Sequence, residues 1–115
     1  MIKKNILKEP YQLEQGCHGG KGTVLFRRIL ENEFQSKVSF LDYTVLPPGA
    51  SIGYHLHPDT EEVYVILGGT GTMTVDNEAT CVVRGDVILN RKGGSHGLTN
   101  DGADNLEILV FEGQF

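Results

Sequence analysis

The sequence predicts an all-β fold, a sandwich or barrel formed by a single domain. Fifteen glycines are scattered through the 115 residues, and no long stretch keeps a 3.6-residue apolar period free of glycine or proline. Short runs of β-branched and aromatic residues, each bounded by turn formers, are frequent instead. Seven or more strands at such spacing are typical of a sandwich or barrel, and a chain of this length has room for one core and one site.

The predicted strands follow one another along the chain with turn residues between them. They are TVLFRRIL (23–30), VSFLDYTVL (38–46), VYVIL (63–67), TMTV (72–75), TCVV (80–83), DVILN (86–90) and LEILVF (106–111). Pro47, Pro48 and Gly49 end the second strand, because proline cannot donate to a strand ladder and glycine accepts positive φ. Asp76 and Asn77 predict a tight hairpin between TMTV and TCVV, since asparagine tolerates the left-handed conformation.

Residues 1–22 are the one irregular segment, and we expect an N-terminal arm leading into a barrel domain at 23–115. The arm ends in GCHGGKG (16–22), whose glycines favour a flexible turn. The neighbours Cys17 and His18 do not by themselves form a catalytic dyad, because a base must approach in space and be oriented by a third group. Lys21 lacks the GxxxxGK[ST] spacing of a phosphate loop.

Composition narrows the class of partner. Ten Lys and Arg against fifteen Asp and Glu give a formal charge of −5, and the basic residues do not cluster. Neither nucleic acid nor a membrane is therefore expected as a partner, and a small molecule is. Cys17 and Cys81 lack CxxC spacing. The N-terminus has no apolar run suited to a signal peptide, and no later segment could span a bilayer, so we expect a cytoplasmic protein.

Three of the four histidines lie in positions that suit a metal site. His55 and His57 are two residues apart, so in a strand they share one face and Leu56 takes the other. Two carboxylates, Glu61 and Glu62, follow closely, and His96 comes after a glycine-rich turn. Imidazole nitrogens together with a carboxylate oxygen suit one divalent transition metal, such as Fe, Mn, Ni, Zn or Cu.

Two spaced motifs resemble those of the cupin superfamily. The first is Gly49-x5-His55-x-His57-x4-Glu62-x6-Gly69, and the second is Gly85-x5-Arg91-x-Gly93-x2-His96-x3-Asn100. The family usually has proline where this chain has Arg91, and the other fixed positions match. Fifteen residues separate Gly69 from Gly85, which is similar to the spacer of small microbial cupins with one conserved barrel domain of the cupin 2 type.

The resemblance implies a single cupin barrel, also called a jelly roll or double-stranded β-helix, with one metal held by four side chains. These are His55, His57, Glu62 and His96, and they leave one or two coordination positions for water, dioxygen or a substrate oxygen. Asn100 matches a position that serves structure more than ligation. Without the proline, the loop before His96 should be looser, and we expect Arg91 and Lys92 to lie in solvent.

Glu61 remains an alternative to Glu62, because Glu61-x6-Gly68 fits the same template. In cupins the motif glycine lies about seven residues before the tight turn, and Gly69 stands seven before Asp76, which favours Glu62. The strand VYVIL is apolar on both faces and does not decide between them. If Glu62 points inward, so do Tyr64 and Ile66.

The resemblance is specific for fold but not for function, since cupins include enzymes and binding proteins. We expect a metal-dependent enzyme acting on a small organic molecule, with dioxygenase-like oxidoreductase chemistry first, oxalate-decarboxylase-like chemistry second, and a sugar isomerase or epimerase last. A non-catalytic binding or sensor module is the alternative, and a barrel without metal is a third possibility.

Two structural expectations accompany these functions. Tyr43, Tyr64 and Ile66 should shape the pocket, and a decarboxylase would need one of Arg27, Arg28 or Arg84 to face inward and hold a second carboxylate. Because VYVIL is apolar on both faces, its outer face needs a cover, and a homodimer is the simplest one.

Overall fold

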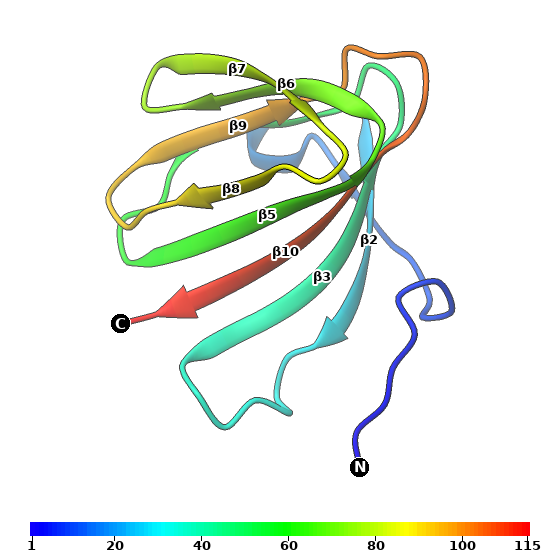
Figure 1. Cartoon of the computed structure of the whole chain (residues 1–115), viewed down its shortest axis with the longest axis vertical. Coiled ribbons are helices and arrows are strands. Elements are labelled where there is room, and N and C mark those ends of the chain that lie inside the picture. Colours follow the sequence, from blue (N-terminus) through cyan, green and yellow to red (C-terminus); the bar gives the residue numbers. More distant parts are fainter.

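The computed structural model describes residues 1–115 and confirms an all-β fold, in which two antiparallel sheets face each other (Figure 1). The six-stranded sheet runs β1 (Gln12–Gln15), β2 (Thr23–Leu30), β3 (Val38–Leu46), β10 (Leu106–Gln114), β5 (Thr60–Gly68) and β8 (Val87–Asn90). The four-stranded sheet runs β4 (Ser51–Leu56), β9 (Ser95–Thr99), β6 (Thr70–Val75) and β7 (Glu78–Val83). A single 3₁₀ turn, η1 (Cys17–Gly19), precedes β2.

Each of the seven strands predicted from the sequence is present, with ends that differ by a few residues. The turns behave as expected: Asp76 and Asn77 have φ of 48° and 67° at the β6–β7 hairpin, and Gly49 has φ of 85° after β3. Three further strands, β1, β4 and β9, were not among the predicted runs. Two of these, β4 and β9, are interrupted by Gly53 and Gly97 and carry histidines in place of apolar residues.

The core fills the space between the sheets, where strand alternation directs one face of each strand inward. Leu46, Met73, Leu106 and Ile108 are completely buried there. Burial of each such side chain contributes about 1.5–3 kcal/mol. On β5 the inward residues Glu62, Tyr64 and Ile66 are all buried, as the sequence argument required if Glu62 faces inward.

The pairing of β4 with β9 places apolar side chains at one end of the two strands and histidines at the other. Ile52 pairs with Leu98 across β4 and β9, and His55 pairs with His96 a few residues along the same strands. The two histidine-bearing strands therefore meet at one level, next to the core.

The expectation that Tyr43 shapes the pocket is wrong. Its neighbours in β3, Asp42 and Thr44, line the cavity between the sheets, so alternation turns Tyr43 to the outer face. There it packs with Ile29 and Val45, and its hydroxyl hydrogen-bonds the carboxylate of Glu107.

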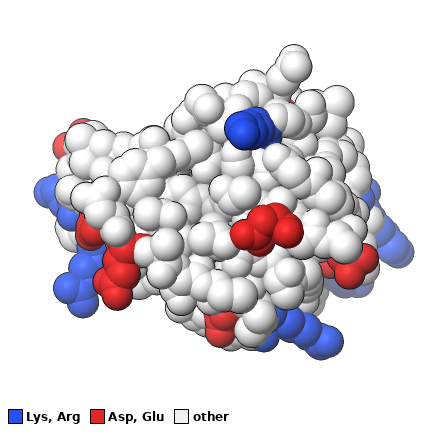
Figure 2. All heavy atoms as spheres, turned by 90° about the horizontal axis from the view of Figure 1, so that it is seen from above, with Lys and Arg blue, Asp and Glu red and all other residues white.

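The N-terminal residues contact the barrel in two places. β1 pairs with β2 along Gln12–Gln15, and η1 lies against β4. The division of the chain at residue 22 stays a prediction. None of the helical segments is long and apolar enough to cross a membrane. On the face seen in Figure 2, basic and acidic side chains are spread apart and form no continuous basic patch.

Candidate metal centre

Four side chains that are distant in sequence come together between the sheets. His55 lies on β4, His57 just after it, Glu62 on β5 and His96 on β9, and one ligand atom from each lies within 4.8 Å of the others. Backbone bonds fix the approach: His57 N donates to Gly94 O at 2.9 Å, and Gly93 N donates to His57 O at 2.7 Å. The loop before His96 is thereby tied to the end of β4. The cluster could hold a metal ion.

The hydrogen bonds of two histidines leave lone pairs facing each other. Nδ1 of His55 donates to Gly53 O at 2.6 Å, since a carbonyl oxygen can only accept. Nδ1 of His57 donates to Thr60 Oγ1 at 3.2 Å, and that hydroxyl donates to Glu112 Oε1 at 3.0 Å. With the protons on Nδ1, both Nε2 atoms are acceptors, and they are only 2.8 Å apart. A cation between them would satisfy both lone pairs.

The carboxylate of Glu62 closes the cluster. Its Oε1 lies 3.1 Å from His57 Nε2 and 3.0 Å from His96 Nε2, and the side chain is buried. Burial raises the pKa of Glu62 to about 7, and the neighbouring His57 opposes part of that rise. Glu61 points to the other face of β5 and is not part of the cluster.

Burial has the opposite effect on the histidines, because it disfavours their charged form. It lowers the pKa of His55 to about 4 and that of His96 to about 4, and it also lowers the pKa of His57. Near neutral pH the imidazoles are therefore uncharged and ready to donate lone pairs. One buried amide beside the cluster, that of Asn90 across from Glu62 on β8, has no hydrogen-bond partner in the protein.

These pKa values predict how metal binding depends on pH. At pH 6 the metal-free protein holds a proton on Glu62 but none on His55 or His96, and burial also lowers the pKa of His57, so binding one divalent ion should release about one proton. At pH 8 it should release close to none. Below pH 7 the affinity should fall about 10-fold per pH unit, and more steeply once His55 and His96 begin to protonate near pH 4.

Titration calorimetry with Zn²⁺, repeated in buffers of different ionisation enthalpy, counts these protons. Release of two or three protons at pH 6 would show that the histidines are charged in the metal-free protein, contrary to this account.

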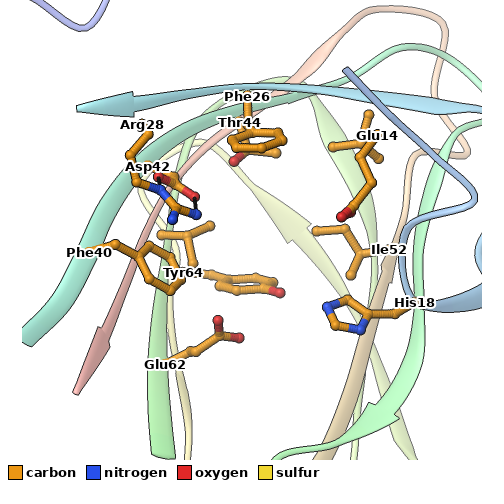
Figure 3. Close-up of a pocket in the computed structure, with 12 residues that line it drawn as sticks. Glu14, His18, Phe26, Arg28, Phe40, Asp42, Thr44, Ile52, Glu62 and Tyr64 are labelled. Atoms are coloured by element: carbon orange, nitrogen blue, oxygen red, sulfur yellow. Dashed lines mark hydrogen bonds and ion pairs between the residues drawn. The ribbon is translucent and has the colours of Figure 1, made fainter. Parts of the chain in front are cut away.

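A cavity of about 150 Å³ opens beside the cluster and is lined by Glu62 and Tyr64 from β5 (Figure 3). On its far side the guanidinium of Arg28 binds Asp42 through two bonds, Nε to Oδ1 at 2.7 Å and Nη2 to Oδ2 at 2.9 Å. A third bond joins Nη1 to Glu31 Oε2 at 2.8 Å. Burial raises the pKa of Asp42, and the bonds from Arg28 offset part of the rise.

Of Arg27, Arg28 and Arg84, the arginine that faces inward is Arg28. It is the only Lys or Arg among the residues that line the cavity, and its guanidinium also lies 4.4 Å from the centre of the Phe40 ring. Arg27 turns to the outer face, where Nη1 donates to Ile6 O at 2.8 Å, and Arg84 is exposed.

The histidine assigned to a flexible turn, His18, lies at this site. Its ring stacks on His55 with centroids 3.6 Å apart and planes 4° from parallel, and it lines the cavity with Glu14. Adjacent Cys17 is buried, which raises the pKa of its thiol to about 12. Nothing in the local spacing pointed to His18, because η1 reaches the site through a tertiary contact with β4.

The remaining motif residues take the places expected of them. Asn100 is fully buried, and its Nδ2 donates to Leu46 O at 2.7 Å and Asp104 O at 2.8 Å, so its role is structural. Arg91 and Lys92 are exposed. The expectation that Ile66 shapes the pocket is wrong, because Ile66 is buried in the hydrophobic core and does not line the cavity. Tyr64 does line the cavity, as expected.

Known proteins are similar to this chain in sequence and in fold. Residues 42–112 match the family described as cupin domain. An oxalate-binding protein of Thermotoga maritima is 36% identical over 93 residues, which are 80% of this chain and 77% of that protein. An uncharacterised protein of Methanocaldococcus jannaschii is 31% identical over 109 residues, which are 95% of this chain and 87% of the relative.

Solved structures agree. The crystal structure of a predicted oxalate decarboxylase from Thermotoga maritima superposes with a TM-score of 0.96 at 29% identity, covering 99% of this chain and 100% of that one. A cupin 2 conserved barrel domain protein from Salinispora arenicola superposes with a TM-score of 0.78 over 99% of this chain and 89% of its own. At 16% identity, that second likeness concerns the fold alone.

Proposed function

Because the chain belongs to the cupin family, we propose that it is a metal-dependent cupin that binds a small carboxylic acid of the oxalate class. Its metal ligands would be His55, His57, Glu62 and His96. The observation that carries this proposal is the convergence of imidazole lone pairs and a carboxylate oxygen on one point, with the Nε2 atoms of His55 and His57 2.8 Å apart.

The donor set suits any of Fe, Mn, Ni, Zn or Cu, so the identity of the ion depends on availability. When bound, the ion would supply a Lewis acid that polarises an oxygen of the ligand. The protein's own groups do the rest. Glu62 compensates the positive charge, and the chain of bonds from His57 through Thr60 to Glu112 holds one imidazole in its orientation.

The cavity supports a ligand as small as oxalate. A cavity of about 150 Å³ accommodates a molecule the size of benzene, which has six non-hydrogen atoms, as oxalate does. Of the five N–H groups of Arg28, three are used by Asp42 and Glu31, leaving two to meet the far carboxylate of the ligand. The names of a curated relative and of a solved structure, an oxalate-binding protein and a predicted oxalate decarboxylase, both from Thermotoga maritima, favour the same class.

Adjacent arginines that face opposite ways provide a matched test. Replacing Arg28 by Lys keeps a positive charge beside Asp42 but loses the planar fork, so oxalate affinity should fall about 10-fold. Arg27→Lys, on the outer face, should leave it unchanged. Calorimetry of the Mn²⁺-loaded proteins measures both affinities. Equal affinities in all three proteins would remove Arg28 from the ligand site.

A decarboxylase is the second candidate function, and the inward position of Arg28 favours it, since that reaction needs a group to hold the second carboxylate. Metal-loaded protein would then convert oxalate and one proton to formate and carbon dioxide. A binding protein would instead be stabilised by oxalate without forming formate. Assay of formate with and without metal separates the two. Dioxygenase-like chemistry, a sugar isomerase or epimerase, and a cytoplasmic location stay predictions from the sequence.

We also propose a homodimer formed through the outer face of the six-stranded sheet. Phe111 pairs with Val63 there, and Val63 pairs with Leu89, so apolar side chains are contiguous across β10, β5 and β8. Phe111 and Leu89 are 37% and 46% exposed. A second copy would cover this face with identical apolar residues, as a two-fold interface requires.

Light scattering coupled to gel filtration should give twice the mass of one chain. Leu89→Asp should shift the protein toward the monomer, because it would bury a charge in the interface, whereas Leu56→Asp on the other sheet should not. A monomeric wild-type protein would refute the dimer.

A further inference from the structure

The N-terminal segment is docked closely beside the metal cluster. A Cβ atom on Gly53 of β4 would lie 2.1 Å from His18 O, and one on Gly20 would lie 2.2 Å from Ser51 O, so both positions need glycine. Backbone and side-chain bonds join the same segments: Ser51 N donates to Lys21 O at 2.9 Å, and Lys21 N donates to Ser51 Oγ at 2.8 Å. This packing fixes the backbone of His18 against the strand that carries His55.

His18 is held in a backbone conformation that few side chains adopt. Its φ of 49° and ψ of 37° lie in the left-handed region, where histidine is more common than most residues but still uncommon. Such conformations persist where surrounding structure imposes them, and they are frequent at functional sites. Here the result is that the imidazole stacks on His55 and reaches the cavity.

The stacking geometry separates His18 from the metal ligands. An imidazole binds a metal in the plane of its own ring, and the ring of His18 is parallel to that of His55 with centroids 3.6 Å apart. Its nitrogens therefore lie about one ring thickness from the plane in which His55 coordinates, beyond a metal–nitrogen bond of about 2.0–2.1 Å. His18 is accordingly outside the four-residue cluster.

The ring nitrogens of His18 are instead available to a ligand. No protein group hydrogen-bonds either of them. In Figure 3 the ring of His18 lies beside Ile52 and faces Glu62 across the cavity, and Arg28 lies on the opposite wall. A small acid seated between these groups would meet His18 on one side and Arg28 on the other. In neutral imidazole one nitrogen carries a proton that it can donate.

We propose that His18 is a ligand-contacting residue that donates a hydrogen bond to a carboxylate oxygen of the bound acid and sets affinity without binding the metal. This inference rests on the proposed function, because it concerns the same ligand. It assigns the N-terminal segment a direct part in recognition, as one wall of the pocket.

Two substitutions separate hydrogen bonding from stacking. His18→Phe keeps a flat ring over His55 but has no N–H group, whereas His18→Asn removes the ring and suits the left-handed backbone. Zn²⁺ affinity, from competition with a chelator, should change less than about 3-fold in His18→Phe. Oxalate affinity of the Mn²⁺-loaded protein should fall at least about 10-fold in both variants, as expected for a bond to a charged group. Melting curves of the metal-free proteins verify folding.

The outcomes distinguish this inference from the proposed function. If wild-type protein binds metal but not oxalate, the proposed function fails and this inference with it. If wild-type and His18→Phe bind oxalate equally, only the role of His18 is overturned. If His18→Phe loses Zn²⁺ affinity as strongly as oxalate affinity, His18 supports the metal and not the ligand, which also overturns the inference.

Discussion

Replacing Glu62 by Gln is expected to lower metal affinity by more than about 100-fold, whereas Glu61→Gln should leave it unchanged. Loss of a group that only orients a ligand costs 10–100-fold, so loss of a charged ligand should exceed that range. The two residues are adjacent in β5, but only Glu62 faces the histidines, with Oε1 3.0 Å from His96 Nε2. Both changes conserve side-chain size and remove one negative charge.

Elemental analysis after loading with Fe, Mn, Ni or Zn and dialysis provides the measurement. Wild-type protein and Glu61→Gln should retain about one metal per chain, and Glu62→Gln should retain little. The reverse pattern would make Glu61 the ligand, which is the alternative that the sequence left open. Less than about half a metal in wild-type protein under every loading would contradict the site itself.

The second large effect concerns stability. A metal at 1,000 times its dissociation constant stabilises the folded chain by about 4.1 kcal/mol when it binds only that state. For a domain of this size, 1 kcal/mol corresponds to roughly 4 °C in melting temperature, so saturating metal should raise it by about 15 °C. His55→Ala removes one of the two facing Nε2 atoms, and this increase should largely disappear.

The comparison is between metal-loaded and metal-free samples of the same variant, which cancels any cost of the substitution to the metal-free fold. Calorimetric scans of Leu56→Ala supply a control from the exposed face of β4, and its metal-induced shift should match that of wild-type protein. A shift of wild-type size in His55→Ala would mean that the metal binds elsewhere.

The sequence predicted the strands whose apolar residues form the core, because their pattern depends on burial alone. It did not predict β4 and β9 as strands from composition, since His55 and His96 occupy inward positions that would otherwise be apolar. The spacing of His55 and His57 still implied a shared face, and the structure places both toward the cluster. Polar ligands at inward positions thus weaken the apolar alternation by which strands are recognised in a sequence.

The positions of Tyr43 and His18 could not be predicted from the sequence. The face that Tyr43 takes depends on the register of β3 in a sheet that has apolar residues on both sides, so alternation alone could not place it. His18 reaches the site because Gly20 and Gly53 allow two backbone segments to touch, and that contact joins residues more than thirty positions apart. Both depend on tertiary contacts, and no pattern of neighbouring residues in the sequence indicates either one.

The central claim is that four side chains hold one metal, and diffraction tests it most directly. Crystals of the protein loaded with Zn²⁺ or Mn²⁺, measured at the absorption edge of that metal, should show one anomalous peak per chain. This peak should lie about 2.0–2.2 Å from His55 Nε2, His57 Nε2, His96 Nε2 and a carboxylate oxygen of Glu62. A peak bound by other residues, or none at full loading, would contradict the claim.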